Sequence, residues 1–241
     1  MDSEVFRVLG EPRFGGILVV ADHASNRVPE DINLHISPEL LNQHIAIDIG
    51  VAGVAERMIR PGIAAYLANV SRLVCDLNRD RDGSGLLPEI SDGHVVPGNV
   101  LCTQGRSSRI IRFFEPYHRR LAELLDAVPP ALILSLHSFT PRLFTSDRPR
   151  PWQVGILYNQ DDRAARIAIP LLEAEGLIVG DQEPYSGKLL NATMNRHAEA
   201  EGRPYLSVEV RQDLIADAAG QAVWAERLAR ICNRIALEMG E

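Results

Sequence analysis

The feature that most constrains the fold is the segment ALILSLH at residues 131–137, which is almost continuously apolar and ends in a histidine. A strand of this kind is covered by protein on both of its faces, as happens in parallel sheets that carry helices on each side. The segment therefore predicts an α/β protein. The polar residues that follow it, His137 and Ser138, indicate either a core histidine with satisfied hydrogen bonds or a ligand at the mouth of a site.

The remaining hydrophobic patterns alternate between strand and helix. Strands are expected at about 16–21, 152–159, 176–181 and 205–213, with one or two more within 64–83 that end in a charged loop. Helices are expected at about 106–128, 161–175 and 221–239. Apolar residues at helical spacing also begin near Glu39, and Gly50 separates this segment into two pieces. Pro116 is expected to kink the helix that contains it. This alternation predicts a single α/β domain over residues 1–241, with a mixed, largely parallel sheet and helices on both faces. Residues 84–105 are the longest stretch without a regular pattern.

The charge balance restricts the partners. The net charge is -7 and the pI is near 5.5, which disfavours nucleic acids and anionic membranes, since phosphate groups require a basic surface. The basic residues are arginines with the single exception of Lys188, and a planar guanidinium suits a carboxylate. We therefore expect a small anionic substrate, and neither nucleic acid nor membrane as a partner. The sequence does not indicate the oligomeric state.

The cysteines and the chain start indicate the compartment. Cys75, Cys102 and Cys232 form no CxxC pair, which disfavours a thiolate zinc site or a disulfide framework and favours a reducing environment. The segment MDSEVFRVLG has neither the basic nor the apolar region of a signal peptide, and no apolar run is long enough to cross a membrane. A cytoplasmic protein is expected.

Polar residues follow three of the predicted strands. His23 comes after the first strand, His137 ends the central one, and Glu209 lies near the end of the last one. Because the carboxyl ends of parallel strands meet at one edge of a sheet, these three side chains are expected to converge. Two imidazoles and carboxylates, with one ligand position left open for water, are what a catalytic zinc site requires.

Each of these residues also has a simpler explanation. His23, in DHASN, could be a loop histidine, and Glu209 could be an outward-facing residue or an ion-pair partner. Asp48 lies inside the apolar run AIDIG, where an acid is costly unless it is paired or binds a metal. The alternatives for Asp48 are a helix cap or a buried salt bridge.

The sequence lacks the motifs of several other classes of enzyme and binding protein. There is no GxSxG elbow of an α/β-hydrolase, no GxxxxGK[ST] phosphate loop and no GxGxxG after the first strand. The cysteines lie outside the polar strand ends, which disfavours thiol catalysis. A metal-dependent reaction is the class that the strand ends favour.

The segments DHASNRVP, AIDIG, SRLVCDLNRDRDG, FFEPYHRRL, LHSFTP and VEVRQDLI, taken in this order, resemble the N-formylglutamate amidohydrolase family from about His23 to Ile215. The chain is more distantly similar to zinc carboxypeptidases and aspartoacylases. The resemblance implies a zinc-carboxypeptidase-like (phosphorylase/hydrolase-like) fold. It also implies hydrolysis of the N-formyl or N-acyl amide of an acidic amino acid such as N-formylglutamate, with zinc or another divalent metal as cofactor.

The resemblance also implies roles for individual residues. His23 and His137 would bind zinc, Glu209 would be the general base, and Arg72 would stabilise the oxyanion or clamp a carboxylate. The distant relatives carry a His-x-x-Glu motif whose Glu position is occupied here by Asn26, so the third ligand must come from elsewhere, and Asp48 is the candidate. The expected substrate-binding residues are Asn78, Arg79, Arg211, Asn26 and Ser138.

Two other functions stay open at this point. A zinc hydrolase of another N-acyl amino acid or of a short peptide would use the same kind of site. A non-catalytic binding protein on the same scaffold would explain Asn26 as a mark of a degraded metal site.

Overall fold

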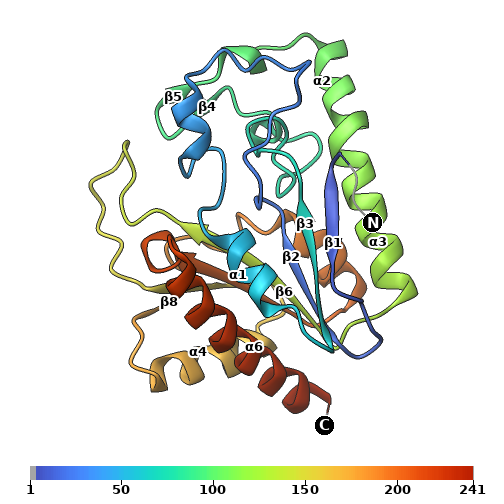
Figure 1. Ribbon diagram of the computed structural model, residues 1–241, viewed down its shortest axis with the longest axis vertical. Coiled ribbons are helices and arrows are strands. Elements are labelled where there is room, and N and C mark those ends of the chain that lie inside the picture. Colours follow the sequence, from blue (N-terminus) through green and yellow to red (C-terminus); the bar gives the residue numbers. More distant parts are fainter. Residues whose placement is uncertain (1–3, 241) are drawn as a thin grey trace.

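The computed structural model describes residues 4–240 and contains a seven-stranded sheet in the order β1-β3-β2-β6-β9-β7-β8 (Figure 1). Residues 1–3 and 241 of the predicted domain lie outside the described residues, and residues 1–3 are also part of the segment assessed for a signal peptide. The strands are β1 Phe6–Leu9, β2 Ile17–Ala21, β3 Ile63–Ala68, β6 Leu132–Phe139, β7 Val154–Leu157, β8 Val179–Asp181 and β9 Tyr205–Arg211. The four central strands are parallel, whereas β1 and β7 run antiparallel to β3 and β9. The predicted mixed, largely parallel sheet is confirmed.

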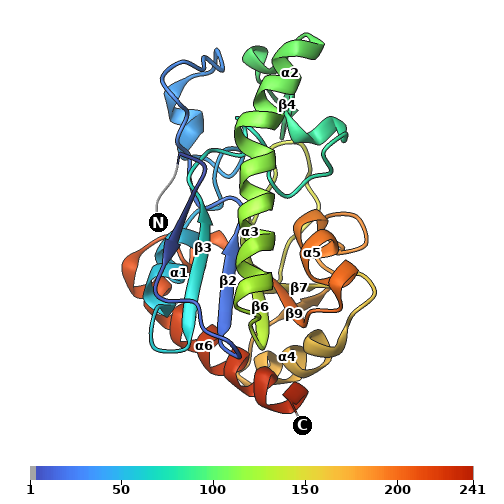
Figure 2. The same ribbon diagram turned by 90° about the vertical axis from the view of Figure 1, so that its right-hand side faces the viewer.

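Helices cover both faces of this sheet, as predicted. One face packs against α1 Val51–Met58, α4 Arg163–Ala174 and α6 Ala218–Gly240. The opposite face packs against α3 Glu115–Ala127, with α5 Ala192–His197 beside it (Figure 2). No helix within residues 4–240 is both long and apolar enough to span a membrane.

The two faces of the central strands contribute to two separate hydrophobic clusters. In β2, Val19 packs towards α1 and α6 whereas Val20 packs towards α3, because successive side chains of a strand point to opposite faces. In β6, Leu134 and Leu136 pack towards α1 and α6. Because side chains alternate along β6, His137 projects from the opposite face, which is covered by α3. The polar site lies on this face.

Gly50 separates two pieces of the segment that was predicted as helical from Glu39. The first piece is only a 3-10 turn, Pro38–Asn42, and the second is α1. Gly50 has a φ of 84°, and a Cβ atom there would lie 2.1 Å from the carbonyl oxygen of Ile215. Only glycine accommodates both conditions. The irregular link between the two pieces carries Asp48.

The predicted helix at 106–128 is continuous but changes its geometry near Pro116. It comprises α2 Thr103–Arg109, a π-helical turn Ile110–Phe114 and α3. Proline has no backbone N–H to donate within a helix, and the π turn is one of the known ways in which a helix accommodates a break in its hydrogen bonding.

Several elements were not anticipated. Within 64–83 only β3 is a strand, and the residues that follow it form turns that lead to Asp76. The strand β1 and the helix α5 were not predicted. The irregular stretch 84–105 contains a small hairpin of β4 Ile90–Ser91 and β5 His94–Val95. The other short 3-10 turns are Ser84–Leu86, Pro97–Asn99, Glu199–Glu201 and Gln212–Leu214.

Candidate metal centre and active site

The candidate site lies at the carboxyl ends of β2, β6 and β9. His23 follows β2 after a single intervening residue, while His137 and Glu209 are direct partners in the register of β6 and β9. Because β2, β6 and β9 are parallel to one another, their ends meet at the same edge of the sheet. The expected convergence of the three side chains is therefore present.

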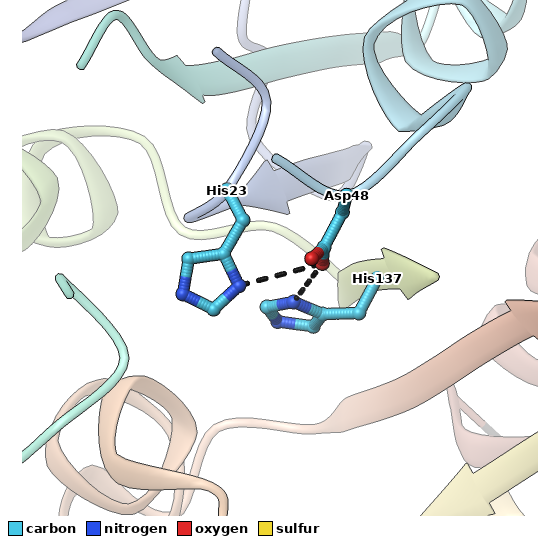
Figure 3. A group of neighbouring side chains, drawn as sticks. All are labelled: His23, Asp48 and His137. Atoms are coloured by element: carbon cyan, nitrogen blue, oxygen red, sulfur yellow. Dashed lines mark hydrogen bonds and ion pairs between the residues drawn. The ribbon is translucent and has the colours of Figure 1, made fainter. Parts of the chain in front are cut away.

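Asp48 joins the two histidines. Its Oδ2 atom lies 3.4 Å from Nδ1 of His23 and 2.9 Å from Nδ1 of His137 (Figure 3). One possible ligand atom from each of these buried residues lies within 4.8 Å of the other two. Burial acts to raise the pKa of Asp48, but the two histidines outweigh burial and hold that pKa well below its usual value. Asp48 is therefore an ionised carboxylate.

The second ring nitrogen of His23 binds a different carboxylate. Nε2 of His23 lies 2.7 Å from Oδ1 of Asp76, and Arg72 binds Oδ2 of Asp76 at 2.8 Å and Oδ1 of Asp48 at 3.3 Å. Burial acts to raise the pKa of Asp76, but Arg72 and His23 lower it well below its usual value. An ionised Asp76 accepts a hydrogen bond from the Nε2–H group of His23, and in this tautomer Nδ1 has a lone pair for a metal.

Glu209 completes the charged part of the site. Its Oε2 atom is buried and has no hydrogen-bond partner among the described residues. Burial raises the pKa of Glu209 to about 7. A carboxyl group with a pKa near neutrality can both accept and release a proton at physiological pH, as a general base and acid must.

A cavity of about 300 Å³ is lined by His23, Asp48, Arg72, His137 and Glu209. Arg79 also lines it, with one guanidinium nitrogen held by the carbonyl oxygen of Asn78 at 2.8 Å. The Oδ1 atom of Asn78 accepts a hydrogen bond from the backbone N–H of Thr193, so the amide NH2 of Asn78 stays available as a donor. The apolar part of the lining is made by Ile45, Phe139, Leu143 and Leu190. Such a mixture of donors and apolar surface suits a small carboxylate-bearing molecule.

Eight of the ten residues selected from the sequence line this cavity, namely His23, Asp48, Arg72, Asn78, Arg79, His137, Ser138 and Glu209. Ser138 acts on Asp48, because its backbone N–H donates to Oδ2 of Asp48 at 3.3 Å and its hydroxyl donates to Ile49. Ser138 therefore holds a proposed ligand in place as well as lining the cavity.

The other two residues, Asn26 and Arg211, do not line the cavity. The side chain of Asn26 donates to Asn42 at 3.0 Å. The guanidinium of Arg211 forms two bonds to Asp213, at 2.8 and 3.1 Å. Each of these side chains binds a residue outside the cavity. Standing in the same motif as a site residue is therefore not enough to place a side chain in the cavity.

The residues that the sequence analysis did not select include Asp22, Asp76 and Tyr185. Asp22 and Asp76 are buried acids beside site residues, and both stand in motifs that also contain a chosen residue. Acids at strand ends could have indicated them. Tyr185 lines the cavity from the loop before α5, and no periodic pattern marks that loop.

The donor set fits a divalent metal. Two buried imidazole nitrogens and a carboxylate oxygen make the combination that zinc commonly binds, and other divalent ions accept similar ligands. The partner carboxylate on Nε2 of His23 matches the arrangement that orients metal-binding histidines in proteins.

The comparisons with known proteins concern the family and the fold. The chain matches the model of the N-formylglutamate amidohydrolase family over residues 15–216. No curated protein matches the chain. The solved structure of a gene product from Agrobacterium tumefaciens is 28% identical, with a TM-score of 0.92 and coverage of 99% of this chain and 97% of that one. An N-formylglutamate amidohydrolase from Ralstonia eutropha JMP134 shares the fold at 22% identity and a TM-score of 0.79, over 98% of each chain.

Proposed function

The chain belongs to the N-formylglutamate amidohydrolase family, and from this membership we propose that it hydrolyses the N-formyl amide of an acidic amino acid, such as N-formylglutamate, at a zinc centre. The observation that carries the proposal is the meeting of three buried ligand atoms, from His23, Asp48 and His137, in a cavity that Glu209 also lines. The products would be formate and the free amino acid.

Nδ1 of His23, Nδ1 of His137 and a carboxylate oxygen of Asp48 would hold the metal. Zinc bound there would supply a Lewis acid and lower the pKa of a water molecule. Glu209 would accept a proton from the attacking water and deliver it to the leaving amine nitrogen. Its unpartnered Oε2 atom and its pKa of about 7 support both halves of this proton transfer.

The substrate would be held by the arginines and the amide of the cavity. Arg79 would bind the substrate carboxylate, aided by the NH2 group of Asn78, because charge-assisted hydrogen bonds are the strong ones. Arg72 would stabilise the negative charge that develops on the acyl oxygen. The two aspartates that bind Arg72 keep its guanidinium in place and raise its pKa further above the ordinary value, although burial alone would lower it.

The test is hydrolysis by the zinc-loaded protein, measured as release of formate from N-formylglutamate. Removal of the metal by a chelator should abolish turnover, and added zinc should restore it. A parallel panel of N-acetylglutamate and short glutamyl peptides distinguishes the alternative substrates. Hydrolysis of these compounds alone would favour a different N-acyl specificity. Failure both to bind zinc and to hydrolyse any of them would favour a non-catalytic binding protein.

A further inference from the structure

Asp22 is a buried carboxylate beside the metal site for which the proposed reaction has given no role. It immediately precedes His23 and is completely excluded from solvent. Its Oδ1 atom accepts a hydrogen bond from the hydroxyl of Tyr117 at 2.7 Å. Its Oδ2 atom has no hydrogen-bond partner among the described residues, although an unpaired buried carboxylate oxygen is costly.

The imidazole of His137 lies close to this oxygen. Oδ2 of Asp22 and Nε2 of His137 lie 3.6 Å apart, and Nε2 of His137 is likewise buried without a hydrogen-bond partner in the described part of the chain. Two unsatisfied polar atoms of opposite character therefore face each other. A shift of well under 1 Å would bring them to an ordinary hydrogen-bond length.

The two histidines consequently have similar surroundings. Each directs Nδ1 towards Oδ2 of Asp48, and each has a buried carboxylate near Nε2, which is Asp76 for His23 and Asp22 for His137. The carboxylates differ in two respects. Oδ1 of Asp76 lies 2.7 Å from Nε2 of His23, whereas Oδ2 of Asp22 lies 3.6 Å from Nε2 of His137. Asp76 is also bound by Arg72, whereas the bond that holds Asp22 comes from the neutral hydroxyl of Tyr117.

We propose that Asp22 is a positioning residue that orients His137 for the metal, with Tyr117 holding Asp22 in place. The inference rests on the proposed metal site and extends it to residues outside the ligand set. Asp22 keeps the proton of His137 on Nε2 and so leaves Nδ1 free to bind the metal. Partner carboxylates of this kind contribute about 10–100-fold to metal affinity in proteins.

The anchoring of Tyr117 explains how the arrangement is kept rigid. Tyr117 lies in α3, is fully buried, and its carbonyl oxygen accepts a hydrogen bond from the hydroxyl of Tyr66 at 2.8 Å. Tyr66 lies in β3, so this hydrogen bond connects Tyr117 to the sheet that carries the site. The position of Asp22 is therefore set by packed secondary structure on both sides.

The experiment measures the zinc dissociation constant of the full-length protein by competition with a chelator. Asp22→Asn keeps the size and a hydrogen-bond acceptor but removes the charge, and it should weaken zinc binding by about 10–100-fold with one zinc still bound per chain. The matched control is Asp181→Asn. Asp181 in β8 also accepts a hydrogen bond from a tyrosine hydroxyl, that of Tyr158 at 2.7 Å, but it does not line the site cavity. The control should change zinc affinity less than about twofold.

A second variant keeps the inference testable if Asp22→Asn does not fold. Tyr117→Phe removes only the hydroxyl that binds Asp22, and it should weaken zinc binding measurably in the wild-type background. Where Asp22→Asn does fold, Tyr117→Phe in that background should have no further effect on zinc affinity, because Tyr117 acts through Asp22. A merely structural role would lower the free energy of unfolding in both backgrounds without this dependence.

Three results would overturn the inference. The first is a zinc dissociation constant within a factor of two of wild type in Asp22→Asn. The second is complete loss of zinc from that folded variant, which would make Asp22 a ligand. The third is additivity of Tyr117→Phe and Asp22→Asn. If the wild type binds zinc but any of these three results is obtained, only the proposed role of Asp22 is wrong. If the wild type binds no zinc, both the proposed metal centre and the role of Asp22 are wrong.

Discussion

Glu209 in β9 and His137 in β6 are paired directly across two parallel strands, so both side chains project from the same face of the sheet. Neighbouring strands are separated by only about 4.8 Å, and hydrogen bonds along both strands fix this register. The proposed base and a proposed metal ligand therefore take their spacing from the sheet and not from a flexible loop. Sites built on such elements are held more accurately than sites built on loops.

Replacement of Glu209 by Gln tests this pairing. The amide cannot accept the proton from water, so we expect kcat to fall by about 10²–10⁴-fold while zinc stays bound. Steady-state kinetics and metal analysis of the purified variant measure the two effects. Glu226→Gln, an exposed glutamate paired with Arg60, is the control and should retain full activity. Hydrolysis at the wild-type rate in Glu209→Gln would remove Glu209 from the mechanism.

Replacement of Arg79 by Met tests the recognition of the substrate carboxylate. Methionine keeps part of the aliphatic stem and removes the charge. A hydrogen bond to a charged group contributes about 1.5–3 kcal/mol, so we expect KM to rise by roughly 10–100-fold with a smaller effect on kcat. The exposed Arg234, which binds Glu238, provides the matched control Arg234→Met. Equal KM values for Arg79→Met and wild type would argue that another group binds the carboxylate.

Zinc should stabilise the folded protein, because it binds the assembled site. At a free zinc concentration about 100-fold above the dissociation constant, the free energy of unfolding should rise by about 2.7 kcal/mol. Thermal unfolding with and without zinc measures this as an increase in Tm. His137→Ala removes one ligand and should lose the increase. An undiminished shift in that variant would mean that zinc stabilises the protein from another place.

Asp92 should make the stability depend on pH in the acid range. Burial acts to raise the pKa of Asp92, but hydrogen bonds from Thr145, the backbone of Phe144 and His44 lower it from 3.8 to about 2. A carboxyl whose pKa is lowered on folding stabilises the protein above about pH 4, and this contribution is lost as the pH falls towards 2.

The corresponding measurement compares Asp92→Asn with wild type by urea unfolding at several pH values. We expect the free energy of unfolding of the variant to be lower by roughly 1–2 kcal/mol at pH 7, where solvent screening keeps the difference small. This difference should shrink as the pH falls from 4 to 2. A difference that stays constant over this range would show that the lost hydrogen bonds, and not the charge, account for the effect.

The sequence by itself determined the class of the fold and the core of the site. The apolar run before His137 requires cover on both faces of its strand, and the helical patterns elsewhere supply that cover. Once the strands are parallel, the positions of His23, His137 and Glu209 at strand ends place them at one edge. Asp48 was recognisable because an acid within an apolar run needs a partner.

Only the tertiary structure decided which polar residues join them. Asn26 and Arg211 belong to the same motifs as site residues, but Asn42 and Asp213 hold them outside the cavity. Asp22 and Tyr117 meet although they are 95 positions apart in the chain. Periodicity reports which face of its own strand or helix a residue occupies. It carries no information about which side chains from other elements reach the same point, because that depends on how the elements pack.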